Sequence, residues 1–157
     1  MKAIPLAALA ALLMLAGGAG AEDEAAAVSP AFDEALAASV GADDNGMRQY
    51  VLVILKTGPT PVPAGEARSE MFRGHFANMK RLAAEGKLAL AGPLDGVDGW
   101  RGLFILAVSD LEEAAALVAT DPVIINGEMV AEYHKYYGSA ALMLVNDAHA
   151  KVARKGF

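Results

Sequence analysis

The chain contains no cysteine. This absence excludes a disulfide framework, a thiolate nucleophile and a cysteine-ligated metal. It also excludes the anchor of a bacterial lipoprotein, which needs an acceptor cysteine after the export signal. A domain without disulfides has to be held together by its hydrophobic core or by association with another chain.

Histidines and clustered basic residues are scarce as well. The chain has three histidines, and none of them shares an H-x-H or H-x-x-x-H spacing, so we expect no metal site. The formal net charge is −6 and the basic residues are dispersed, apart from Arg154-Lys155 near the end. Because nucleic-acid phosphates need basic patches, we expect no nucleic-acid partner. The sequence contains neither a Gly-Lys-Ser/Thr phosphate loop nor a Gly-x-Ser-x-Gly element, and we expect no cofactor.

Long apolar runs are limited to the start of the chain. Lys2 is followed by the apolar run 4–16 and then by the small residues Ala19-Gly20-Ala21, a pattern typical of a signal peptide cleaved after Ala21. The run is too short to span a bilayer, which takes about 20 apolar residues. We therefore expect residues 1–21 to be a signal peptide and the protein to be periplasmic or secreted, with no membrane span. A retained interfacial anchor is the alternative.

The rest of the chain alternates between strand and helix patterns. Apolar runs with β-branched residues predict strands, and apolar residues at helical spacing predict helices. Asp110 and Glu113 form a capping-box pattern that starts a helix, and this helix is expected to end before Asp121-Pro122. The expected elements are a strand at 49–56, a helix at 66–85, strands at 87–91 and 102–108, a helix at 111–120 and a strand at 128–137.

This order predicts an α+β fold with a ferredoxin-like βαββαβ sheet and both helices on one face. We place that domain at residues 48–138. It follows an acidic, alanine-rich extension at 22–47, in which 30–40 is expected to be helical, and it precedes a helical extension at 139–157. Since helices cover only one face of the sheet, a second copy of the chain is expected to cover the other. The sequence thus predicts a homodimer.

His75 is the first candidate for chemistry. It lies at the edge of the apolar stripe of its helix, one turn from Phe72, Met79 and Leu82. A histidine placed in this way is able to act as a general base. The other interpretation is a structural histidine that hydrogen-bonds a backbone carbonyl at the edge of the core, and both remain open.

Asp121 is the second candidate. It lies where the preceding helix is expected to end, which is unfavourable for an acid because the partial charge there is negative. This position suggests a compensating partner such as a histidine. The alternative is a turn in which the carboxylate hydrogen-bonds the backbone after Pro122.

Other polar or turn residues are candidates for ligand binding. His134 shares a strand face with Glu132 and Tyr136, where it either lines a pocket or faces water. The Gly92-Pro93 turn, with Arg101 nearby, is able to close over a ligand.

The most specific sequence feature is the step from His75 through Gly86 and Lys87-Leu88 to Ala91-Gly92-Pro93, with Asp121-Pro122 after an alanine-rich helix. These residues resemble the YCII-related domain family. The resemblance implies ferredoxin-like subunits that dimerise through their sheets into a dimeric α+β barrel, with His75 and Asp121 as a catalytic pair.

The chain departs from the short members of that family at three places. It has Lys56-Thr57-Gly58 where many place an acid, and Val123 where an aromatic residue is common. It also carries an export signal and terminal helices, with a Tyr-Gly-Ser-Ala-Ala segment at 137–141 that resembles an exported subfamily. The departures bear on the acid partner of His75 more than on the fold.

Two functions remain open from the sequence. The first is a cofactor-independent lyase or isomerase that acts on a small cyclic or aromatic molecule, in which His75 moves a proton and Asp121 orients His75. The second is a dimeric module that binds a small apolar ligand without changing it, in which His75 only contributes a hydrogen bond. Related dimeric barrels include lactone isomerases and cofactor-free oxygenases, so the fold alone does not choose a reaction.

Overall fold

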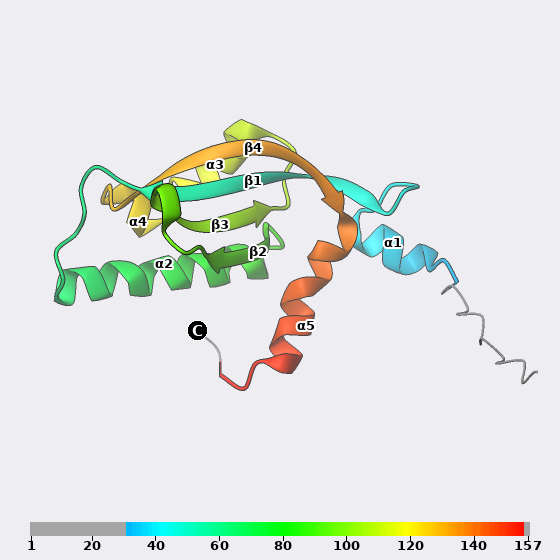
Figure 1. The fold of residues 1–157 in the computed structure, drawn as a ribbon. Coiled ribbons are helices and arrows are strands. Elements are labelled where there is room, and N and C mark those ends of the chain that lie inside the picture. Colours follow the sequence, from blue (N-terminus) through cyan, green and yellow to red (C-terminus); the bar gives the residue numbers. More distant parts are fainter. Residues whose placement is uncertain (1–30, 156–157) are drawn as a thin grey trace, which may run out of the picture. The chain divides into compact units, whose positions relative to one another are not determined.

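A four-stranded antiparallel sheet organises the chain. The structure is a computed structural model that describes residues 31–155, so the expected signal peptide lies outside the described residues. The strands are β1 (Met47–Thr57), β2 (Leu88–Pro93), β3 (Trp100–Leu106) and β4 (Met129–Ser139), in the spatial order β2-β3-β1-β4. Figure 1 shows β1 between β3 and β4, each antiparallel to it. This order confirms the ferredoxin-like α+β fold.

The helices that build the core pack on one face of this sheet. They are α2 (Glu66–Ala84), α3 (Leu111–Val118) and the short α4 (Pro122–Ile125). Within residues 31–155, no helix combines the length and hydrophobicity that a membrane span needs. The fully buried core side chains come from both layers and include Val51, Val53, Leu82, Leu106, Val118 and Val123.

The remaining elements precede β1, join β2 to β3, or follow β4. They are α1 (Glu34–Val40), the 3₁₀ turns η1 (Val97–Gly99) and η2 (Ala140–Leu144), and α5 (Val145–Val152). The first of these is shorter than expected, because Asp33 caps it by accepting a hydrogen bond from the backbone N–H of Leu36.

Local sequence signals explain where α2 and α3 begin and end. After α2, Gly86 adopts φ +68°, and the N–H groups of Gly86 and Lys87 bond the carbonyls of Ala83 and Leu82, which closes the helix as a Schellman motif. Asp110 caps α3 through the N–H groups of Glu112 and Glu113. The predicted capping box is only half formed, because the Glu113 carboxylate bonds Lys87 and not the backbone of its cap.

Asp121 begins a helix instead of ending one. The preceding helix α3 stops at Val118, and Asp121 is the N-cap of α4, with Pro122 at the first helical position. Proline suits that position because its missing N–H would be unpaired there anyway. The expectation of an acid at an unfavourable helix C-terminus was therefore wrong, and the helix dipole of α4 favours the carboxylate.

The second face of the sheet is partly covered by the chain itself. Leu142 and Met143 of η2 pack against Tyr50, Ala89 and Ile105, and these three are buried. The expectation of a wholly uncovered face was wrong at this end of the sheet. Elsewhere on this face Trp100, Val130 and Tyr136 remain 37–44% exposed.

Gly74 explains why α2 and α4 approach so closely. A Cβ at this position would lie 2.9 Å from Cγ of Pro122, closer than carbon atoms pack. Alanine ordinarily stabilises a helix interior by about 1 kcal/mol relative to glycine. We nevertheless expect Gly74→Ala to lower the free energy of unfolding by about 1–3 kcal/mol, because α4 has to move.

Urea denaturation measures this change. The matched control is Ala77→Gly at an exposed position of the same helix, which should cost about 1 kcal/mol through helix propensity alone. A Gly74→Ala protein more stable than wild type would contradict the packing explanation.

Candidate active site

His75 and Asp121 form a buried hydrogen-bonded pair. The Nδ1 atom of His75 lies 2.8 Å from Oδ2 and 2.9 Å from Oδ1 of Asp121. Asp121 is completely buried and His75 is 8% exposed. An ionised carboxylate only accepts hydrogen bonds, so Nδ1 carries a proton and donates it toward Asp121. His75 therefore bonds a carboxylate and not a backbone carbonyl.

The Asp121 carboxylate has a second function in the fold. Its Oδ1 also accepts the backbone N–H of Val123 at 3.1 Å. The turn interpretation of Asp121 and its pairing with His75 thus hold at once, because Oδ1 accepts the Val123 N–H while His75 Nδ1 lies within hydrogen-bond distance of both carboxylate oxygens.

Asn78 is a member of the site that sequence reasoning missed. It follows His75 by three residues on the buried face of α2, and its Nδ2 donates to Asp121 Oδ2 at 3.3 Å. The Asn78 Oδ1 accepts from Arg81 and Thr120, which fixes the orientation of the amide. The sequence did hold a signal for Asn78, because it is a second polar residue beside His75 on an otherwise apolar face of the helix.

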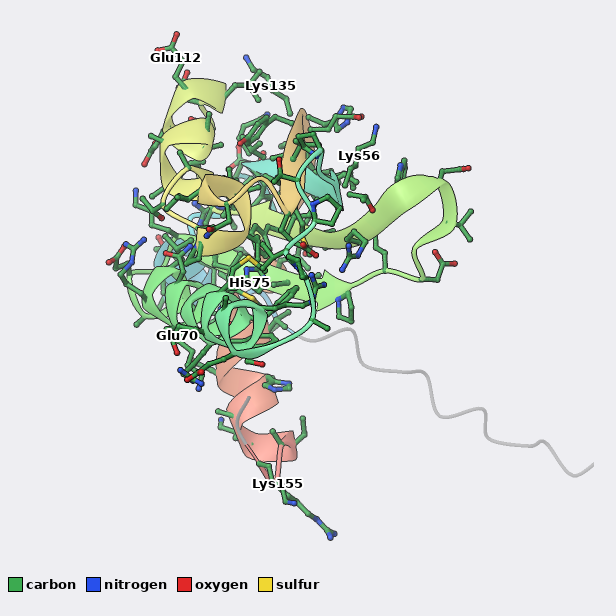
Figure 2. The ribbon with its side chains drawn as sticks, turned by 90° about the vertical axis from the view of Figure 1, so that its left-hand side faces the viewer. Lys56, Glu70, His75, Glu112, Lys135 and Lys155 are labelled. Atoms are coloured by element: carbon green, nitrogen blue, oxygen red, sulfur yellow. The ribbon has the colours of Figure 1, made fainter. Side chains whose placement is uncertain are left out.

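The second ring nitrogen of His75 is open to solvent. Its Nε2 makes no hydrogen bond within the described part of the chain, yet no buried side-chain nitrogen or oxygen there lacks a partner. Nε2 must therefore be accessible. In Figure 2, His75 points from α2 toward the sheet, whereas Glu70 of the same helix points away. The imidazole is thus held at one nitrogen and available at the other.

A small apolar cavity of about 270 Å³ lies against His75. The rings of Phe72, Phe76 and Phe104 lie 5.4–6.1 Å from the imidazole ring, centroid to centroid. The other lining residues come from α2 and all four strands: Met79, Leu55, Gly92, Pro93, Arg101, Gly102 and Met129. The structure thus brings Gly92, Pro93 and Arg101 to His75, and their role in ligand binding stays a prediction.

Glu128 supports one side of the cavity and was also missed. It is 2% exposed, and its two oxygens are 2.7 Å from Arg68 Nη2 and from the backbone N–H of Val62. The Arg68 hydrogen bond is the main reason why the pKa of Glu128 lies below its ordinary value, and burial opposes that shift. Its partners precede it by about sixty residues, so no local signal marked it.

His134 lies away from this cavity. It is on the sheet face opposite α2, where its Nε2 contacts Glu132 Oε1 at 2.7 Å, and its side chain is half exposed. The structure therefore does not bring His134 to the same site as His75. The described residues also contain no group of three or more histidine and acidic side chains able to hold a metal.

The fold and the site define a ferredoxin-like α+β domain with a histidine–aspartate pair beside a small apolar cavity. The chain matches the YCII-related domain over residues 48–134 and belongs to that family. It is 34% identical over 81 residues to "Uncharacterized protein YjpA" of Bacillus subtilis (strain 168), which covers 52% of this chain and 85% of that protein.

Among solved structures, the chain is similar to the 5-chloro-2-hydroxyhydroquinone dehydrochlorinase TftG of Burkholderia phenoliruptrix AC1100, determined with 2,5-dihydroxybenzoquinone. The sequences are 19% identical, the TM-score is 0.40, and the match covers 55% of this chain and 92% of TftG.

Proposed function

We propose that the protein is a cofactor-independent lyase or isomerase that moves a proton on a small cyclic or aromatic molecule. The observation that carries this proposal is the state of His75. Its Nδ1 is bonded to a fully buried carboxylate, and its Nε2 is accessible beside a cavity. A histidine held in this way has a fixed tautomer and a free basic nitrogen, which is the arrangement of histidine–carboxylate pairs in general.

In the proposed reaction, Nε2 of His75 accepts a proton from an acidic C–H or O–H of the bound molecule. The imidazolium that forms is stabilised by the negative charge of Asp121. Return of the proton to another atom completes an isomerisation, and departure of a leaving group with its electron pair completes an elimination. The rings of Phe72, Phe76 and Phe104 give the reacting atoms apolar neighbours, and Asn78 donates a hydrogen bond that keeps Asp121 in place.

The test is turnover by the purified wild-type protein with a panel of lactones and halogenated phenols, followed by product analysis. In deuterated water, a reaction through His75 should place deuterium on the carbon that is reprotonated. Ligand binding without turnover or deuterium exchange would support the non-catalytic binding module instead.

We also propose that the protein forms a homodimer through the sheet face that lacks α2. Trp100 and Val130 both pair with Lys56 in the sheet, so their side chains gather on that face, where each is over 40% exposed. Exposed apolar side chains gathered on one face are typical of an association surface.

We expect wild-type protein to sediment as a dimer at micromolar concentration and Trp100→Glu protein to sediment as a monomer, because a charge would be buried without a partner. The matched control is Ile125→Glu, an exposed apolar residue of α4 on the other side of the sheet, which should remain dimeric. A monomeric wild-type protein would overturn the proposal.

Export remains part of the proposed function. We propose that residues 1–21 are removed and that the mature protein works in the periplasm or outside the cell. Mass spectrometry of protein recovered from the periplasm should find an N-terminus at Glu22.

A further inference from the structure

We infer that Arg101 is an anion-binding residue of the cavity, and that the molecule bound there is a small ring compound bearing a carboxylate or phenolate oxygen. This inference takes one element from the proposed function, namely that the ligand binds beside His75. His75 and Arg101 are the two ionisable side chains among the lining residues, and no lining residue is acidic.

A β-bulge directs Arg101 to the cavity. On β1, Leu55 pairs with Gly102 of β3 while the next residue, Lys56, pairs with Trp100, so Arg101 is the additional residue between them. In a regular ladder, Arg101 would pair with Lys56 and lie on the opposite face of the sheet. Bulges are frequent beside active sites because they redirect a side chain.

The guanidinium of Arg101 also has bonding capacity to spare. Its one ion pair within residues 31–155 is with Glu128, at 3.6 Å between Nη1 and Oε1, which is too long for a hydrogen bond. The side chain is 31% exposed. Five N–H donors are therefore left for solvent or for a ligand.

Glu128 does not neutralise this site. Its oxygens are already bonded at 2.7 Å to Arg68 and to the backbone N–H of Val62. Arg68 is further engaged by the Val62 carbonyl at 2.7 Å and by the Phe72 ring. The three side chains Glu128, Arg68 and Arg101 together carry one net positive charge. Of the two arginines, Arg101 is the one that lines the cavity.

The apolar walls and the volume set the rest of the ligand. A cavity of about 270 Å³ with three phenylalanine rings accommodates a single ring better than an extended polar chain. A guanidinium binds two oxygens of a carboxylate in parallel, or one phenolate oxygen. We therefore expect the anionic oxygen to lie at Arg101 and the ring to lie between Arg101 and His75.

The test is equilibrium binding of benzoate and of benzamide, which have nearly the same shape but differ in charge, measured by calorimetry on the full mature protein. Wild type should bind benzoate at least tenfold more tightly than benzamide. In Arg101→Gln the benzoate affinity should fall at least tenfold while the benzamide affinity stays unchanged, and Arg101→Lys should be intermediate because it loses the paired donors. The matched control is Arg73→Gln, which removes an exposed arginine of α2 outside the cavity.

Equal binding of the two probes, binding of neither, or a benzoate preference that survives in Arg101→Gln would each overturn the inference. Thermal unfolding checks that the variants fold. The comparison of benzoate with benzamide binding uses wild-type protein alone, so it tests the inference even if a variant does not fold. His75→Asn should keep the benzoate preference. A preference that depends on Arg101 in a protein without turnover would therefore sustain this inference while the proposed catalysis fails.

Discussion

Replacing His75 with asparagine is expected to lower turnover by about 10²–10⁴-fold, which is the usual contribution of one positioned proton-transfer group. Asparagine fits the space of the imidazole on the Asp121 side and is able to donate to the carboxylate, but it offers no basic nitrogen to the cavity. The effect should therefore appear in kcat, with a small change in ligand affinity. Steady-state kinetics on the best substrate of the panel measures the split between kcat and KM.

Asp121→Asn separates the role of the carboxylate from its role in the fold. The amide oxygen is able to replace Oδ1 as the cap for the N–H of Val123, so α4 should still form. The charge that stabilises the imidazolium is lost, and turnover should fall at least 10²-fold. The thermal midpoint should also fall, because the new amide nitrogen faces the Asn78 donor in a buried position, and the turnover is therefore measured below that midpoint.

The matched control for His75→Asn is His134→Asn, which makes the same change to a histidine on the opposite face of the sheet. This control should retain full turnover. Loss of activity in this control would show that His134 contributes to the site after all. Full activity in His75→Asn would remove the catalytic proposal.

Much of the fold could be predicted because its signals are local. The continuous apolar run of β1, Gly86 after α2 and the Asp110 cap each act within a few residues of the element they define. The end of α3 was expected before Asp121-Pro122, but the short helix α4 was missed, because the same two residues also suit the start of a helix.

The site could be predicted only in part because its contacts are long-range. His75 and Asp121 were identified as candidates, but their contact spans 46 residues and depends on the approach of α2 to α4 at Gly74. The orientation of Arg101 depends on a bulge that is defined only when β1 pairs with β3.

The largest stability effect is expected at Glu128. Glu128→Gln keeps the side-chain shape and the acceptor for the Val62 N–H but removes the buried negative charge opposite Arg68 and Arg101. Breaking a buried ion pair costs about 3–5 kcal/mol, and we expect a value near the lower end because Arg68 is 29% exposed. The matched control is Glu113→Gln, which breaks a surface pair with Lys87 and should cost less than about 1 kcal/mol.

We also expect the stability difference between wild type and Glu128→Gln to depend on pH. The hydrogen bond from Arg68, followed by that from the Val62 N–H, holds the pKa of Glu128 below its usual 4.5 in the folded state. A carboxyl group whose pKa is depressed by folding stabilises the protein fully above its unfolded pKa, and this stabilisation is lost as the pH falls through the folded pKa. Urea denaturation of wild type and Glu128→Gln should therefore differ most near pH 7, and the gap should narrow below about pH 4.5 as the wild-type carboxyl group becomes neutral. A gap that stayed constant to pH 3 would show that the charge of Glu128 is not what stabilises this side of the cavity.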